Sequence, residues 1–233
     1  MEVEARGLRV MDPLYAGLER QLILLGKRET AGWKVGLTSG QARDSMGMGF
    51  RPFGYIVPHR IFPTGARLPF SAPDAFGIEN ELCFSFGRDL CDEVDRADVI
   101  SAITSVAPAF EINEQRLKPG ATPQQRLEDN LSQWGIVVGD KRKLDWTDFP
   151  FDSVSVDLTL DGELVETVMA RNHIDDHFRS LVALATTLAR FDRSIKAGDQ
   201  VITGSFTRQR VVRTGRWRGD FGSVIGDVEV EFS

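Results

Sequence analysis

The chain has 233 residues, of which 42% are hydrophobic and 27% are charged, enough to form a hydrophobic core and too apolar for an intrinsically disordered chain. Its 28 Lys and Arg residues against 34 Asp and Glu residues give a formal net charge of -6, the wrong sign for neutralising nucleic-acid phosphates. No apolar run approaches the roughly 20 residues of a membrane helix, and the N-terminus lacks a secretory signal. We therefore expect a cytoplasmic protein without a nucleic-acid or membrane partner.

Glycine and proline are scattered along the chain, and there is no internal repeat or linker-like segment. This organisation predicts a single domain over residues 1–233. Cys83 and Cys91 are the two cysteines, and neither lies in a CxxC pair or near a histidine. We expect both to be reduced thiols rather than part of a disulfide or a zinc site.

The N-terminal part predicts a helix, a strand and a loop. Asp12 as N-cap and Pro13 at the first helical position begin a helix over residues 13–25, which Gly26 ends. Residues 30–38 alternate in the period-2 pattern of a strand. Residues 39–58 are rich in Gly and Met and predict an irregular loop with one helical turn at 40–45.

The rest of the chain predicts mainly strands. Residues 78–86 alternate as a strand, residues 95–106 have helical spacing, and a short apolar stretch at 108–112 leads into the polar segment 113–128. A further helix is expected at 177–191, and Asp161-Gly162 predicts a hairpin. The other expected strands are 135–139, 154–160, 163–169, 200–203, 211–214 and 226–232. Because strands outnumber helices and hairpins outnumber βαβ units, the predicted class is α+β.

Three acidic residues are the first candidates for chemistry. Glu79 and Glu81 lie two residues apart in a predicted strand. Their side chains therefore point to the same face, and their backbone positions are about 7 Å apart. Either solvent or a hard divalent cation such as Mg²⁺ can separate such charges. Glu111 lies within an apolar stretch, where an unpaired carboxylate is costly. The residues alone leave open whether it binds a metal or pairs with Arg116 or Lys118.

Lys34 is a second candidate, because it shares a strand face with Gly36 and Thr38, whose small side chains leave room for a ligand. A solvated lysine is the alternative. The histidines lack the spacing of a typical metal motif: His173 and His177 are more typical of a polar pair at a helix end. No nucleophile elbow, P-loop or dinucleotide fingerprint is present.

Several short motifs, taken in order, resemble one family. They are GWKVGLTS at 32–39, ENEL at 79–82, GRDL at 87–90, FEI at 110–112, DN at 129–130, and KAGD at 196–199 running into TGS at 203–205. From about Leu14 to Ser233 the chain resembles the 2-oxopent-4-enoate hydratase and 4-oxalocrotonate decarboxylase branch of the fumarylacetoacetate hydrolase superfamily.

This resemblance implies a β-rich roll with flanking helices, assembly into homo-oligomers, and a 2-oxo acid or its enol as substrate. It implies that Glu79, Glu81 and Glu111 bind Mg²⁺ or Mn²⁺ and that Lys34 is catalytic and lies beside the substrate. The other substrate-binding residues expected from it are Thr38, Asn130, Thr203, Gly204 and Ser205, with the loop at 203–205 closing over the ligand.

The chain departs from the family pattern in three places. The N-terminal helical segment before the equivalent of Leu14 is shortened. The loop after Lys34 has Pro52 in its RPFG segment (51–54), where the branch commonly has an acidic residue, and Pro52 cannot transfer a proton. The segment 171–177 also differs from the usual entry into the next helix.

The expected reaction is hydration of a 2-hydroxy-2,4-dienoate through a metal-stabilised enolate. Decarboxylation of a 4-oxalocrotonate-type acid is the alternative that shares this intermediate, and hydrolysis of a 3-acylpyruvate ranks third, because no His and Glu pair for activating water is visible. A hypothesis of another class is a non-catalytic metal-binding homologue that stabilises a partner enzyme.

Overall fold

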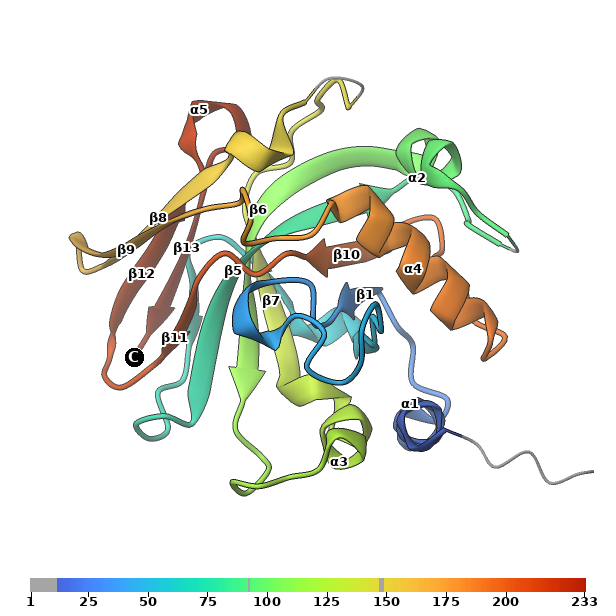
Figure 1. The fold of residues 1–233 in the computed structure, drawn as a ribbon. Coiled ribbons are helices and arrows are strands. Elements are labelled where there is room, and N and C mark those ends of the chain that lie inside the picture. Colours follow the sequence, from blue (N-terminus) through green and yellow to red (C-terminus); the bar gives the residue numbers. More distant parts are fainter. Residues whose placement is uncertain (1–11, 92, 147–148) are drawn as a thin grey trace, which may run out of the picture.

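The computed structural model describes residues 12–91, 93–146 and 149–233, which form two β-sheets with helices packed around them (Figure 1). The eight-stranded sheet has the order β2-β1-β10-β5-β6-β7-β3, with β11 paired to β5 outside this path. Its strands are β1 (Gly32–Val35), β2 (Phe53–Ile56), β3 (Ile61–Pro63), β5 (Phe76–Phe86), β6 (Ile103–Glu114), β7 (Gln133–Val138), β10 (Gln200–Thr203) and β11 (Arg208–Arg210).

The second sheet has the order β4-β13-β12-β8-β9. Its strands are β4 (Ala66–Leu68), β8 (Ser155–Leu160), β9 (Glu163–Met169), β12 (Gly215–Asp220) and β13 (Asp227–Phe232). The predicted hairpin between β8 and β9 is confirmed, with positive φ angles of 53° at Asp161 and 86° at Gly162. Mixed sheets with few helices confirm the α+β class.

The helices are α1 (Pro13–Leu25), α2 (Arg96–Ala102), α3 (Pro123–Glu128), α4 (His177–Ala189) and α5 (Gly222–Ile225), with short 3₁₀ turns at Gly40–Ala42, Pro58–Arg60, Asn130–Ser132 and Phe151–Ser153. The predicted helix α1 is confirmed, with the Asp12 side chain accepting from the Leu14 amide at 2.9 Å. α1 packs on α3 through the buried Gln21, whose Nε2 donates to the carbonyls of Leu127 and Phe53. No helix of the described residues is long and apolar enough to cross a membrane.

Three of the expected elements are wrong. Residues 103–106 were expected in a helix but begin β6. Their β-branched side chains favour a strand, which pairs with β5 once α2 has ended. Residues 53–56, expected in a loop, form β2 against β1. Residues 211–214, expected as a strand, connect β11 to β12.

The face of the eight-stranded sheet that carries Lys34, Glu79, Glu81 and Glu111 is called the site face below. Register places the side chains of a small aliphatic cluster on it: Ile56, Cys83, Ala107, Ala109, Ile136, Val138 and Ile202. The opposite face packs into the larger hydrophobic core with the helices and the second sheet. Both faces of β5 are therefore buried over its eleven residues, and the expectation of a possible solvated polar face is wrong.

Candidate metal centre

Three glutamates from the two longest strands converge on the site face. Glu79 and Glu81 lie two residues apart on β5, and Glu111 of β6 is directly opposite Glu79 in the antiparallel register. The three residues are only 8%, 4% and 2% exposed, and one carboxylate oxygen from each lies within 4.8 Å of the others. Among the described residues, they are the only such group of three or more potential metal-binding side chains.

The partners of the three carboxylates differ. Arg208 binds Glu79 through two nitrogens, Nε at 2.8 Å from Oε1 and Nη2 at 3.0 Å from Oε2, and Asn113 donates to the same Oε1 at 3.0 Å. Lys34 forms an ion pair with Glu111. Oε2 of Glu81 is buried without a hydrogen-bond partner within the described part of the chain. Glu81 is therefore the carboxylate that the chain leaves uncompensated.

The pKa values of the carboxyl groups follow this asymmetry. Burial raises the pKa of Glu81 well above its usual value, and the neighbouring charges of Glu111 and Glu79 raise it further. Burial also raises the pKa of Glu111, to about 6, although Lys34 opposes the shift. Burial acts in the same direction on Glu79, but the charges of Arg208 and Lys34 outweigh it and lower its pKa. Two of the three groups thus take up a proton more readily than an isolated carboxyl group, and a further cation would oppose this.

This donor set fits a divalent metal ion. Carboxylate oxygens are the ligands that hard cations such as Mg²⁺ prefer, and none of the described residues donates to the buried Oε2 of Glu81. The triad together with Lys34 and Arg208 carries one net negative charge when all five groups are ionised. A divalent cation would reverse that charge and favour an anionic ligand.

Lys34 is buried beside the triad rather than solvated. It is 7% exposed, and its Nζ donates to Glu111 and, at 3.1 Å, to the carbonyl of Leu131. The approach depends on Gly54 in the neighbouring strand β2, because a Cβ there would lie 2.9 Å from Cγ of Lys34. The suggestion that Arg116 or Lys118 pairs with Glu111 is wrong: Lys34 is the partner, and Arg116 binds Glu114 and Asp129 instead.

The loop after β10 contacts the triad at one point. The Ser205 hydroxyl donates to the carbonyl of Thr207 at 3.1 Å, and the Ser205 side chain helps to lower the pKa of the neighbouring Glu79. The Gly204 amide donates to Oγ1 of Thr38 at 3.3 Å, which ties this loop to the segment after β1. Thr203 lies directly opposite Leu82, so its buried side chain is on the face opposite the glutamates.

Asn130 acts on the backbone next to Lys34. Its Oδ1 accepts from the Tyr55 amide at 2.8 Å, and its Nδ2 donates to the Tyr55 carbonyl at 3.0 Å. Asn130, Leu131 and Ser132 have positive φ angles of 57°, 53° and 63°, a conformation that is costly for residues other than glycine. Both features position the Leu131 carbonyl that accepts from Lys34.

Two of the departures from the family pattern meet in space. Pro52 is buried, and its neighbour Arg51 binds Asp175 of the unusual segment 171–177, with Nη2 and Nε at 2.5 and 2.9 Å from Oδ2. Arg43 contacts the same carboxylate at 3.1 Å. Nearby, burial lowers the pKa of His177 to about 4, so this histidine is neutral at pH 7 and packs against Phe84 and Phe151.

Arg208 and Asn113 are site residues that the sequence interpretation missed. Arg208 lies on β11, a strand of three residues that was expected a few positions later in the chain. Arg208 and Arg210 lie two positions apart, and this period-2 spacing is the signal that could have placed a short strand there.

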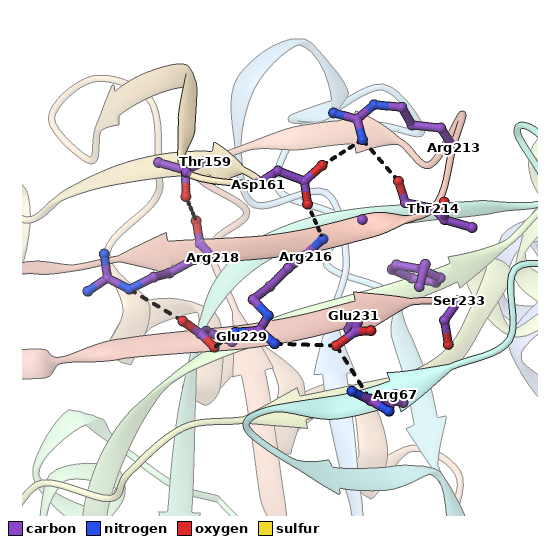
Figure 2. A pocket seen from close by; sticks show the side chains of 13 residues that line it. Arg67, Thr159, Asp161, Arg213, Thr214, Arg216, Arg218, Glu229, Glu231 and Ser233 are labelled. Atoms are coloured by element: carbon purple, nitrogen blue, oxygen red, sulfur yellow. Dashed lines mark hydrogen bonds and ion pairs between the residues drawn. The ribbon is translucent and has the colours of Figure 1, made fainter.

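A hollow of about 1130 Å³ lies on the second sheet and contains none of the predicted site residues (Figure 2). Its lining alternates arginines with acids on β12 and β13. Arg213 binds Asp161 at 2.6 Å, and Arg216 and Arg67 each approach Glu231 to 3.4 Å. Each of these arginines has an acidic partner, and their side chains are 54–73% exposed, so this hollow lacks the buried charge of the triad.

Comparison with known proteins finds relatives of similar sequence. No family model matches it. It is 26% identical over 212 residues to the 2-keto-4-pentenoate hydratase of Paraburkholderia xenovorans, covering 90% of this chain and 78% of the relative. It is 26% identical over 185 residues to a 4-oxalocrotonate decarboxylase of Pseudomonas sp, covering 79% and 71%.

The fold agrees with these relatives. The structure of 4-oxalocrotonate decarboxylase from Pseudomonas putida G7, complexed with magnesium and adipate, matches with a TM-score of 0.80 at 23% identity, covering 96% of this chain and 87% of that chain. The chain is thus similar in sequence to a 2-keto-4-pentenoate hydratase and a 4-oxalocrotonate decarboxylase, and it shares its fold with a solved 4-oxalocrotonate decarboxylase.

Proposed function

We propose that this chain is a lyase that uses Mg²⁺ or Mn²⁺ and acts on a 2-oxo acid or its enol, with hydration of a 2-hydroxy-2,4-dienoate as the main reaction. The observation that carries the proposal is the buried triad in which Glu81 has an unpartnered oxygen. Relatives named as hydratases and as a decarboxylase supply the reaction class.

Glu79, Glu81 and Glu111 would hold the metal ion. Glu79 and Glu111 lie opposite each other on paired strands, and Glu81 is one pleat deeper on β5, so the protein fixes all three positions through backbone pairing. When bound, a divalent cation supplies a Lewis acid that polarises the oxygen of a carbonyl group and stabilises negative charge developing on it.

Lys34 is the proposed catalytic residue. Its ammonium group lies between Glu111 and the Leu131 carbonyl, with little access to water, so it can bind the substrate carboxylate or hold a proton at Nζ. Gly54 and Asn130 position it, the first by its lack of a side chain and the second by fixing the backbone of the adjacent loop.

The remaining substrate-binding residues are Thr38, Asn130, Thr203, Gly204 and Ser205. Ser205 supports this role most directly, through its contact with Glu79. Thr38 supports it through the hydrogen bond that joins the segment after β1 to the loop after β10. Thr203 and Asn130 act indirectly, since one side chain lies on the opposite face and the other binds the Tyr55 backbone.

In the proposed hydration, the 2-hydroxydienoate is converted to its keto form and water then adds to the remaining conjugated double bond. The product is a 4-hydroxy-2-oxo acid. Decarboxylation of a 4-oxalocrotonate-type acid is the second candidate, which is favoured by the fold match to a 4-oxalocrotonate decarboxylase at a TM-score of 0.80. Both reactions need the same negative charge to be stabilised at the C2 oxygen.

Product analysis by NMR tests the proposal. Metal-free protein is mixed with a panel of 2-hydroxydienoates and oxalocrotonate-like acids, with and without added Mg²⁺ or Mn²⁺. We expect metal-dependent formation of a 4-hydroxy-2-oxo acid; loss of carbon dioxide instead would favour the decarboxylase. A metal-induced rise in melting temperature without turnover of any acid would indicate a non-catalytic homologue, and absence of both effects would refute the metal site.

A further inference from the structure

Two arginines of β11 extend the site face outward from the triad. β11 pairs with the N-terminal half of β5, with Arg208 opposite Glu79 and Arg210 opposite Gly77 (Figure 1). Residues directly opposite in an antiparallel pair share a face, so both arginines lie on the side that carries the glutamates. Arg208 forms an ion pair with Glu79, whereas Arg210 lies two residues farther along β11, away from the triad.

Arg210 lies over this face beside Gly77 and Asn113. A Cβ at Gly77 would lie 3.9 Å from Nη1 of Arg210 and 3.8 Å from Cβ of Asn113. Asn113 in turn donates to Glu79. The guanidinium group of Arg210 therefore lies beside the residue that contacts the triad, and exposure rises outward from the buried Glu79, through the half-buried Asn113, to the exposed Arg210.

Arg210 has no carboxylate partner within the described residues. Its Nη2 donates to the amide oxygen of Gln115 at 2.9 Å, a neutral acceptor. By contrast, Arg208, Arg213, Arg216 and Arg218 on the same C-terminal segment each bind at least one acid. Arg210 thus presents an uncompensated positive charge that suits a carboxylate, which a guanidinium group binds in a two-pronged geometry.

The charge balance of the whole site points in the same direction. With a divalent cation bound, the triad, Lys34 and Arg208 carry one net positive charge, which the carboxylate of a 2-oxo acid neutralises. Arg210 adds a second positive charge, so the site as a whole matches a dianion. Strand rise places Arg210 about 7 Å beyond the level of Glu79, within reach of a chain of about six carbons with bonds of about 1.5 Å.

We propose that Arg210 is a specificity-determining residue that selects substrates with a second carboxylate at the end remote from the 2-oxo acid group. The inference rests on the proposed function, because it assumes that the 2-oxo acid end binds at the triad. A hydrocarbon end would leave Arg210 solvated and would gain nothing from its charge.

The test compares two 2-hydroxy-2,4-dienoates of equal length, one ending in a carboxylate and one in a methyl group. For the metal-loaded protein we expect a higher kcat/KM with the diacid. Arg210→Gln should reduce this preference at least tenfold, mainly through KM, and Arg210→Lys should restore part of it because the charge remains. Arg216→Gln, which alters an exposed arginine on β12, should retain the wild-type preference.

Calorimetry supplies a readout without turnover: Mn²⁺-loaded protein should bind a saturated 2-oxo diacid more tightly than the matching monoacid, and Arg210→Gln should remove the difference. An unchanged preference in Arg210→Gln, or a wild-type preference for the methyl-ended acid, would overturn this inference while leaving the proposed function intact. If the metal-loaded wild type neither binds nor converts any of these acids, the proposed function fails and this inference fails with it.

Discussion

The triad on β5 and β6 and the charged face of β12 and β13 both gather acids and bases, but they bury them to very different extents. The triad residues are at most 8% exposed, and Glu81 lacks a partner for one oxygen. On the second sheet, the side chains of Arg216 and Glu231 are 59% and 25% exposed, and each arginine has an acid beside it (Figure 2).

The two regions differ in what their charges do. Exposed ion pairs such as those on β12 and β13 contribute little to stability, because water screens them. Buried like charges oppose folding unless they are protonated or neutralised. Three buried carboxylates beside the two positive charges of Lys34 and Arg208 therefore lower the stability of the metal-free protein, and the contrast can be tested residue by residue.

The largest effect is expected for Glu81→Gln. Removing the uncompensated carboxylate should raise the melting temperature of the metal-free protein, because the substitution removes a buried charge next to Glu79 and Glu111. The same change should weaken metal binding beyond the roughly 10- to 100-fold loss typical of outer-shell partners. Thermal unfolding with and without Mn²⁺ measures both.

Glu231→Gln is the matched control for this comparison, since it removes a carboxylate of the same type from the exposed face. It should leave metal binding at the wild-type level. If Glu81→Gln instead lowers the stability of the metal-free protein and keeps its metal response, the contrast between the two regions is wrong.

Lys34→Ala is expected to lower kcat at least about tenfold without abolishing metal binding, because it removes a buried donor beside the substrate but no carboxylate ligand. Steady-state kinetics at saturating metal, with metal affinity measured separately, distinguish a role of Lys34 in turnover from a role in metal binding. Lys196→Ala, an exposed lysine paired with Asp89, is the control. Full activity of Lys34→Ala would remove Lys34 from the mechanism.

The response to pH should distinguish metal-free from metal-loaded protein. The pKa of Glu111 is raised to about 6 and that of Glu81 is raised well above its usual value, so both groups stabilise the metal-free fold at low pH and lose that contribution as the pH rises above the usual range of a carboxyl group. Metal binding requires the ionised forms. The increase in melting temperature caused by Mn²⁺ should therefore grow between about pH 5 and about pH 8.

Glu79, whose pKa is lowered, acts in the opposite sense, since its stabilising contact with Arg208 is lost only as the pH falls below the usual range of a carboxyl group. Measuring Glu81→Gln over the same pH range isolates the effect of the carboxyl groups whose pKa is raised. A metal-induced shift that stays constant over this pH range would contradict the assignment.

The smallest effect is expected on the second sheet. Arg216→Gln should change the free energy of unfolding by no more than about 0.5 kcal/mol, because its pairs with Glu229 and Glu231 are exposed. Denaturant unfolding of the metal-free protein measures this change. A loss of several times that size would show that the charges on this face form a cooperative network.

Local sequence patterns predicted the parts of the site that depend on neighbouring residues. Alternation along β5 placed Glu79 and Glu81 on one face, and Asp161-Gly162 marked the hairpin of β8 and β9. The register of Glu111 against Glu79 is a pairing between distant segments, which alternation within one strand cannot specify. The family resemblance, rather than the residues themselves, linked the three glutamates.

The partners of the triad were harder to predict for the same reason. Lys34 reaches Glu111 only because β1 and β10 add to the edge of β5, and Arg208 reaches Glu79 because a strand of three residues pairs beside it. A candidate partner close in sequence, Arg116, binds Glu114 and Asp129 instead. Short strands have too few residues for a clear period, so their contacts are set by the tertiary fold.

The most direct test of the metal centre is a crystal structure of the protein soaked with Mn²⁺, with an anomalous difference map calculated from the manganese signal. We predict one strong peak in contact with carboxylate oxygens of Glu79, Glu81 and Glu111. A map in which the peak lies elsewhere, while Arg208 and Lys34 keep their carboxylate partners and Glu81 contacts no metal, would contradict the account.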